Sequence, residues 1–148
     1  MSFTFFNLIS QTKETSIRPI LVVLGTVQDG GLPHIGCAKS CCSNLTPEQG
    51  VHYQVTSLAV KQPKINTSIL FEASPDIVSQ WNQLGNSPTA VFLTHAHIGH
   101  YTGLMHLGRE ALGAKNIPVY AMPRMHSFLK SNAPWSQLVE LKNIELIK

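Results

Sequence analysis

Thr94-His95-Ala96-His97-Ile98-Gly99-His100 brings three histidines together directly after the apolar run Ala90-Val91-Phe92-Leu93. The apolar run predicts a strand over 89–94, and residues i and i+2 beyond its end can point the same way. His95 and His97 can therefore face one ion, while His100, at the start of the next helix, approaches from another side. Imidazole nitrogens are common ligands of transition metals, and the carboxyl end of a strand is the usual place for a site in an α/β protein. The stretch therefore predicts a metal site.

Strand and helix signals alternate on both sides of this loop, which predicts the α/β class. Ser74-Pro75-Asp76 has the residue types that begin a helix, and Gly85 is the type that ends one. Ile20-Leu21-Val22-Val23-Leu24 is continuously apolar, which predicts a strand buried on both faces. The remaining expected elements are strands over 55–60, 68–73 and 117–122, a helix over 102–112, a helical turn or two over 125–130, and two short strands within 138–147.

The composition is typical of one globular domain. The 148 residues are 43% hydrophobic and 13% charged, which argues against disorder. The net charge of +3 comes from scattered lysines and arginines, so no binding of nucleic acid is expected. No apolar run is long enough to cross a bilayer, and no membrane partner is expected. We expect residues 1–19 to form a tail or an edge segment rather than a signal peptide, and residues 20–148 to form the domain.

Three cysteines, Cys37, Cys41 and Cys42, follow a glycine-rich loop that also contains His34. An odd number of cysteines so close together is a poor disulfide framework. The cluster therefore indicates a reducing compartment, which favours the cytoplasm, or a metal site. The three thiols with His34, or with a ligand from another chain, match the nitrogen and sulfur donors of a structural zinc site. Ordinary thiols in a surface loop are the alternative.

The segment from Leu93 to Leu104 resembles the HxHxDH loop of the metallo-β-lactamase superfamily. The segments 25–33, 71–76 and 119–123, with the cysteines between the first two, are similar in order to the family of coenzyme PQQ synthesis protein B. The resemblance extends from about Ile20 onward, although chains of that family are longer. It implies that residues 20–148 are the N-terminal αβ half of a metallo-β-lactamase-type αββα sandwich, and that this half is truncated.

The resemblance also implies roles for the histidines. His95 and His97 would bind a first metal, whose third histidine would lie beyond Lys148, and His100 would bind a second metal. Gly99 stands where the family has an aspartate that binds this second metal, and glycine has no ligand atom. We therefore expect at most one metal at the histidine loop. Zinc is the first choice, with iron or manganese as alternatives, and a structural zinc is implied at the cysteine cluster.

Two acidic residues have two readings each. Asp29 follows the first strand and is the candidate catalytic residue, as a hydrogen-bond acceptor beside the metal ligands or as a contact to substrate. The alternative is a turn residue before two glycines. Glu72 ends the strand predicted over 68–73, where the fold has an acid that braces the histidine loop, and a solvated strand end is the alternative.

These residues and the resemblance lead to three alternative predictions of function. The first is a metal-dependent enzyme that hydrolyses or oxidises a small-molecule precursor. The second is a non-catalytic protein that carries PQQ or a related cofactor, which the glycine at position 99 favours. The third is an inactive fragment of a longer metallohydrolase, which would associate with itself through an exposed sheet face. The sequence lacks phosphate-loop, dinucleotide-binding and Gly-x-Ser-x-Gly motifs, so nucleotide-driven and serine-hydrolase functions lose their usual support.

Overall fold

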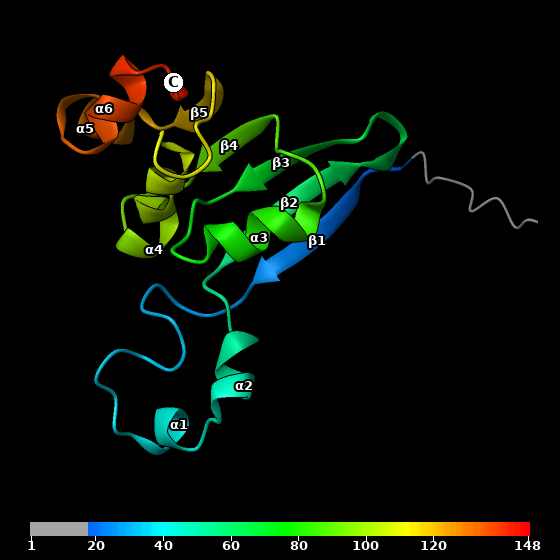
Figure 1. Cartoon of the computed structure of the whole chain (residues 1–148), viewed down its shortest axis with the longest axis vertical. Coiled ribbons are helices and arrows are strands. Elements are labelled where there is room, and N and C mark those ends of the chain that lie inside the picture. Colours follow the sequence, from blue (N-terminus) through cyan, green and yellow to red (C-terminus); the bar gives the residue numbers. More distant parts are fainter. Residues whose placement is uncertain (1–17) are drawn as a thin grey trace, which may run out of the picture.

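A computed structural model describes residues 18–148 and contains one six-stranded sheet with the strand order β1-β2-β3-β4-β5-β6 (Figure 1). The strands are β1 (Ile20–Gly25), β2 (Ser57–Gln62), β3 (Thr67–Phe71), β4 (Ala90–Leu93), β5 (Ile117–Ala121) and β6 (Ile144–Ile147). The α-helices are α1 (Ser40–Ser43), α2 (Pro47–Val51), α3 (Ile77–Leu84), α4 (Ile98–Tyr101), α5 (Pro123–Ser131) and α6 (Trp135–Glu140), and the 3-10 helices are η1 (Pro63–Ile65) and η2 (Thr102–Leu107). The predicted α/β class is confirmed.

The sheet has an antiparallel part and a parallel part. β2 pairs antiparallel with both β1 and β3, and the pairs from β3 to β6 are all parallel. The parallel strands carry their carboxyl ends to one edge, where β3 and β4 end at Phe71 and Leu93. The segments that follow these two strands therefore lie next to each other, and the histidine loop is one of them.

One face of the sheet is covered by helices and forms the core. Its central row joins Ala59, Leu70, Val91 and Val119, which lie opposite one another on β2 to β5 and are fully buried. These residues belong to one apolar cluster with residues of the covering helices, namely Ile77, Leu84, Leu104, Leu107, Met125, Leu129 and Leu138. Burial at alternate positions is what a sheet with one covered face produces.

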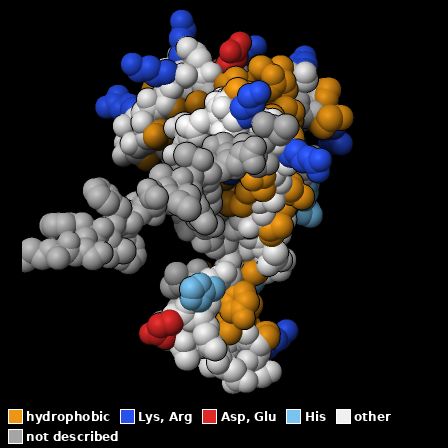
Figure 2. Space-filling model, turned by 90° about the vertical axis from the view of Figure 1, so that its right-hand side faces the viewer, with side chains coloured by type: hydrophobic (Ala, Val, Ile, Leu, Met, Phe, Trp, Pro, Cys, Tyr) orange, Lys and Arg blue, Asp and Glu red, His pale blue; other side chains and the backbone are white. Residues whose placement is uncertain are grey.

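The other face carries a second apolar row that crosses all six strands. Its members share a register position on consecutive strands and are, in order, Val23, Leu58, Phe71, Phe92, Tyr120 and Ile147. Aromatic rings stack along the row, with centroids 5.5 Å apart for Phe71 and Phe92 and 4.3 Å apart for Phe92 and Tyr120. Every member of this row, which we call the open-face row, keeps part of its surface exposed. Figure 2, which views the molecule from the right-hand side of Figure 1, shows hydrophobic side chains in orange at the surface of the sheet.

The expected burial of the first strand on both faces is wrong. β1 forms at the predicted place but, within residues 18–148, lies at the edge of the sheet and pairs only with β2. Leu21 and Val23 are 63% and 58% exposed. A continuous apolar run predicts a strand but does not say which side chains another layer will cover.

Two further expectations fail for identifiable reasons. The helix predicted over 102–112 is the short 3-10 helix η2 followed by turns, because the chain leaves helical backbone at Gly108, whose φ of −68° and ψ of 172° are extended. The first of the two strands predicted within 138–147 is wrong because this part belongs to α6, which begins after Pro134. The second is β6. Proline favours the start of a helix, and this signal was present in the sequence.

The connection from β1 to β2, residues 26–56, extends away from the sheet and contains α1, α2 and the cysteines (Figure 1). A parallel bridge between Val27 and Val55 closes its base. The turn that contains Asp29, next to this base, contacts the histidine loop. In residues 18–148, no helix is long and apolar enough to span a membrane.

Candidate metal centre

The histidine loop leaves β4 at Thr94 and enters α4, whose N-cap is His97. Backbone hydrogen bonds fix its path, since the His100 N–H donates to the His97 carbonyl and the Ala73 N–H donates to the His100 carbonyl, both at 2.9 Å. The loop is thus held on the segment that follows β3. This arrangement confirms that the three histidines lie together at the carboxyl ends of two neighbouring strands.

The three imidazoles cluster closely. His95 Nε2 lies 3.0 Å from His97 Nδ1, and the ring centroids of His95 and His100 are 4.0 Å apart. His95 and His97 are exposed, whereas His100 is buried. The cluster therefore has an open side, formed by the first two histidines, and a protected side, formed by the third.

Asp29 joins this cluster from a distant part of the chain. One of its carboxylate oxygens, Oδ1, lies 3.0 Å from His100 Nε2, and the other, Oδ2, lies 3.3 Å from His97 Nδ1. The residue sits in the turn closed by the hydrogen bond from the Gly31 N–H to the Gln28 carbonyl. Asp29 is therefore both a turn residue and a neighbour of the histidines. The two predictions for this residue, a place in a turn and a place beside the metal ligands, are compatible.

Glu72 braces the loop from behind, in agreement with the first of its two readings. It is 5% exposed and accepts hydrogen bonds from the Thr94 hydroxyl at 2.5 Å and from the Thr94 N–H at 3.4 Å. Its Oε2 also lies 3.4 Å from the buried Nδ1 of His100, an ion-pair distance without hydrogen-bond geometry. Sequence analysis missed Thr94, whose hydroxyl also lies 2.8 Å from His95 Nδ1 and so links Glu72 to that ring.

These residues fit a transition metal by donor type and by spacing. Nitrogen and oxygen ligands of a tetrahedral zinc ion, with bonds of about 2.0–2.1 Å, lie about 3.3 Å from one another. His95 Nε2 lies 3.0 Å from His97 Nδ1, and the two oxygens of Asp29 lie 3.0 Å from His100 Nε2 and 3.3 Å from His97 Nδ1, so each of these contacts joins one pair of donor atoms. One set of three ligand atoms, from Glu72, His95 and His100, lies within 4.8 Å of one another, and Glu72 is also engaged by Thr94.

The cysteine cluster is a separate group with its three thiols within 4.8 Å of one another. The group contains Cys37, Cys41 and Cys42 but not His34, whose expected place as fourth ligand the structure does not reproduce. A hydrogen bond from the Cys37 thiol lowers the pKa of Cys42, and the same bond raises the pKa of Cys37. Cys42 is therefore the thiol of this pair that ionises first.

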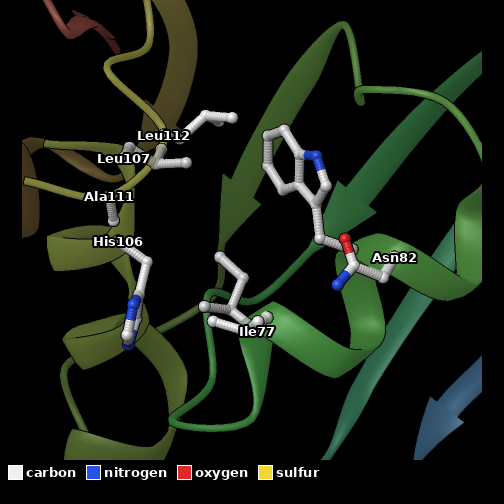
Figure 3. Close-up of a pocket in the computed structure, with 8 residues that line it drawn as sticks. Ile77, Asn82, His106, Leu107, Ala111 and Leu112 are labelled. Carbon is white, nitrogen blue, oxygen red and sulfur yellow. The ribbon is translucent and has the colours of Figure 1, made fainter. Parts of the chain in front are cut away.

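A third feature is an apolar pocket of about 250 Å³ between α3 and the segment that begins with η2 (Figure 3). Ile77 and Asn82 line it from α3, and His106 and Leu107 line it from η2. His106 is exposed, and the pocket contains none of the candidate metal ligands. The pocket is therefore distinct from the histidine loop.

Comparisons with known proteins give a family and a fold. A family model described as beta-lactamase superfamily domain matches residues 67–146. A new diphosphatase from the PhnP family is 26% identical with a TM-score of 0.65, over 88% of this chain and 50% of that one. Zn(2+)-bound PqqB from Methylobacterium extorquens is 24% identical with a TM-score of 0.67, over 86% of this chain and 45% of that one. The chain spans about half the length of these structures. A search of curated proteins finds no match.

Proposed function

The chain belongs to the beta-lactamase superfamily, and from this premise we propose that its histidine loop binds one divalent transition metal for hydrolysis or oxidation of a small-molecule precursor. The predicted superfamily is confirmed, and so is the predicted fold, an αβ half of the metallo-β-lactamase type. The metal, the substrate and the reaction belong to the proposal. Zinc is its first choice because zinc is the ion named for the similar PqqB structure.

The observation that carries the proposal is the convergence of three histidines with two carboxylates: ligand atoms of Glu72, His95 and His100 lie within 4.8 Å of one another, and His97 and Asp29 contact this group. Three imidazoles so close together need a shared cation or hydrogen-bond acceptors, because their nitrogens otherwise repel or remain unpaired. Glu72 and Thr94 support the loop through hydrogen bonds of the chain itself, which orient the His95 ring. Such support of the ligands from behind is typical of functional metal sites.

A metal bound here would lower the pKa of a coordinated water toward neutrality and would polarise a substrate oxygen. The chain's own residues supply the setting for this chemistry. His95 and His97 face solvent and leave one side of the cluster accessible to a small substrate, while His100 and Glu72 close the other side. Asp29, with a side chain 30% exposed, is the carboxylate at the open side that can accept a proton or contact substrate.

The second candidate function is a carrier for PQQ or a related cofactor. In this function the site at the histidine loop would hold the cofactor without turning it over. One observation favours it: position 99 is glycine and offers no ligand atom to a second metal. The two functions are separated by turnover, because a carrier retains its ligand chemically unchanged after incubation with metal. A chelator would leave binding by a carrier intact and would abolish the reaction of the enzyme.

Metal content of histidine variants tests the proposal. The double variant His95→Ala and His97→Ala should lose one equivalent of zinc after equilibrium dialysis and elemental analysis, since both substitutions remove ligands. The matched control is the double variant His106→Ala and His126→Ala, which removes two histidines away from the cluster and should bind zinc like the original chain. Unchanged zinc content in the first variant would contradict the proposal.

A further inference from the structure

We propose that Asp29 supplies the carboxylate ligand of the histidine-loop metal and takes the place that the side chain of residue 99 would otherwise fill. This inference rests on the proposed function, because it assumes that the histidine loop binds a metal. It assigns to the glycine-rich loop after β1 a direct role in the metal site. It also makes the glycine at position 99 a requirement of the site rather than a lost ligand.

The first step is steric. A Cβ atom built on Gly99 would lie 2.5 Å from the Asp29 Cα, 2.8 Å from its Cβ and 3.1 Å from its Cγ. Two of these distances are shorter than real carbon contacts allow, and the shortest involves backbone that cannot rotate away. Asp29 and a side chain at position 99 therefore exclude each other. The space in which the family motif carries its aspartate is filled here by an aspartate from another loop.

The second step is orientation. Oδ1 of Asp29 faces Nε2 of His100, and Oδ2 faces Nδ1 of His97, at 3.0 Å and 3.3 Å. A carboxylate with one oxygen toward each of two imidazole nitrogens lies on the side of the cluster where their ligand atoms point. Each separation is close to the value of about 3.3 Å between neighbouring donors of a tetrahedral ion with bonds of about 2.0–2.1 Å, and each is made by a different oxygen of the carboxylate.

The third step assigns different roles to the two carboxylates. His100 has Glu72 beside Nδ1 and Asp29 beside Nε2, so the two acids flank opposite sides of one ring. A metal-bound histidine commonly donates its other N–H to a carboxylate, which fixes its tautomer. Glu72 is buried and engaged by Thr94, which suits this positioning role, whereas Asp29 is more exposed and lies on the ligand side.

Binding of Co²⁺ to the chain tests the inference, with the visible absorption bands of the ion as a readout of its ligands. Asp29→Asn keeps the size of the side chain but removes its charge, and should weaken binding at the histidine loop more than 100-fold with a changed visible spectrum. Loss of a residue that only orients ligands costs about 10–100-fold. A smaller loss, or an unchanged spectrum, would therefore overturn the inference.

Two controls accompany this variant. Glu140→Gln also removes one negative charge, from an exposed site on α6, and should bind Co²⁺ like the original chain. The near-ultraviolet charge-transfer bands of cobalt bound to thiolates report the cysteine cluster and should stay constant in every variant. Together they separate a lost ligand from a change in overall charge or in fold.

Gly99→Ala provides an independent test because it removes no ligand atom. Its methyl group should displace Asp29 and weaken Co²⁺ binding at least tenfold, while Gly113→Ala, which meets no atom but strains a backbone at φ +59°, should leave binding unchanged and so controls for lost stability. Binding of Gly99→Ala at full strength would overturn the inference. If the original chain binds no metal through His95 and His97, the proposed function fails as well. If it binds and Asp29→Asn binds equally, only the inference fails.

Discussion

Glu72 adopts a backbone conformation that its side chain disfavours. Its φ is +71°, in the left-handed region where a residue other than glycine costs about 1–2 kcal/mol. The conformation ends β3 and turns the carboxylate under the histidine loop, where Thr94 donates to it. Strain of this kind persists when surrounding contacts determine the conformation, and it is concentrated at functional sites.

Substitution of Glu72 separates this strain from its hydrogen bonds. Glu72→Ala should destabilise the chain by about 1–3 kcal/mol, because Thr94 and His100 lose a buried partner while the strain remains. Glu72→Gly loses the same contacts but relieves the left-handed backbone, so it should be more stable than Glu72→Ala by about 1 kcal/mol. Denaturant-induced unfolding measures both values. Equal stability of the two variants would show that the backbone strain has no energetic weight.

Sequence reasoning reached the residues whose spacing is local. His95, His97 and His100 lie within one loop, so the period of a strand and the length of the loop suffice to bring them together. Asp29 is 71 positions away from His100 in the sequence, and its contact depends on the register of the sheet and on the turn after β1. Pairings over such distances are fixed by tertiary packing, which no local pattern contains.

Elements whose ends are set by remote backbone contacts were the hardest to predict. A Cβ on Gly103 would lie 2.0 Å from the Ser74 carbonyl oxygen, so η2 packs directly against the segment after β3. The helix is short because the backbone becomes extended at Gly108, which the apolar spacing of residues 102–112 does not reveal. By contrast, α3 ends as predicted, because Gly85 adopts a left-handed φ of +71° at its C-cap, although it begins after Asp76 rather than at Pro75.

A structural zinc ion at the cysteine cluster should stabilise the 26–56 segment, and limited proteolysis can test this. The segment depends on few contacts with the sheet, and zinc held by Cys37, Cys41 and Cys42 would tie α1 to the preceding loop. Zinc should slow limited proteolysis within 26–56, and Cys41→Ser should abolish that protection. The control is the double variant His95→Ala and His97→Ala, which should keep it. Equal cleavage with and without zinc would contradict a structural zinc site.

At the scale of the whole molecule, the open-face row is an apolar surface that is partly exposed to solvent. Apolar area of this kind favours association, and we expect the isolated chain to pair with itself through this face. Leu21→Lys with Val23→Lys places two charges on the exposed edge strand and should shift the sedimentation coefficient toward that of a monomer. Leu141→Lys, also at an exposed apolar position but after α6, is the control and should leave association unchanged. A monomer before any substitution would contradict the expectation.

The strand order, which follows the chain from β1 to β6, has a consequence for the kinetics of folding. Each strand after β1 that emerges during synthesis finds its neighbour already made, so only β1 has to wait for a partner from farther along the chain. The connections between consecutive strands after β2 are all shorter than the 26–56 segment, so closing each of them costs less chain entropy. The slow step is then the first, the closure of β1 onto β2 across the loop that carries the cysteines and Asp29.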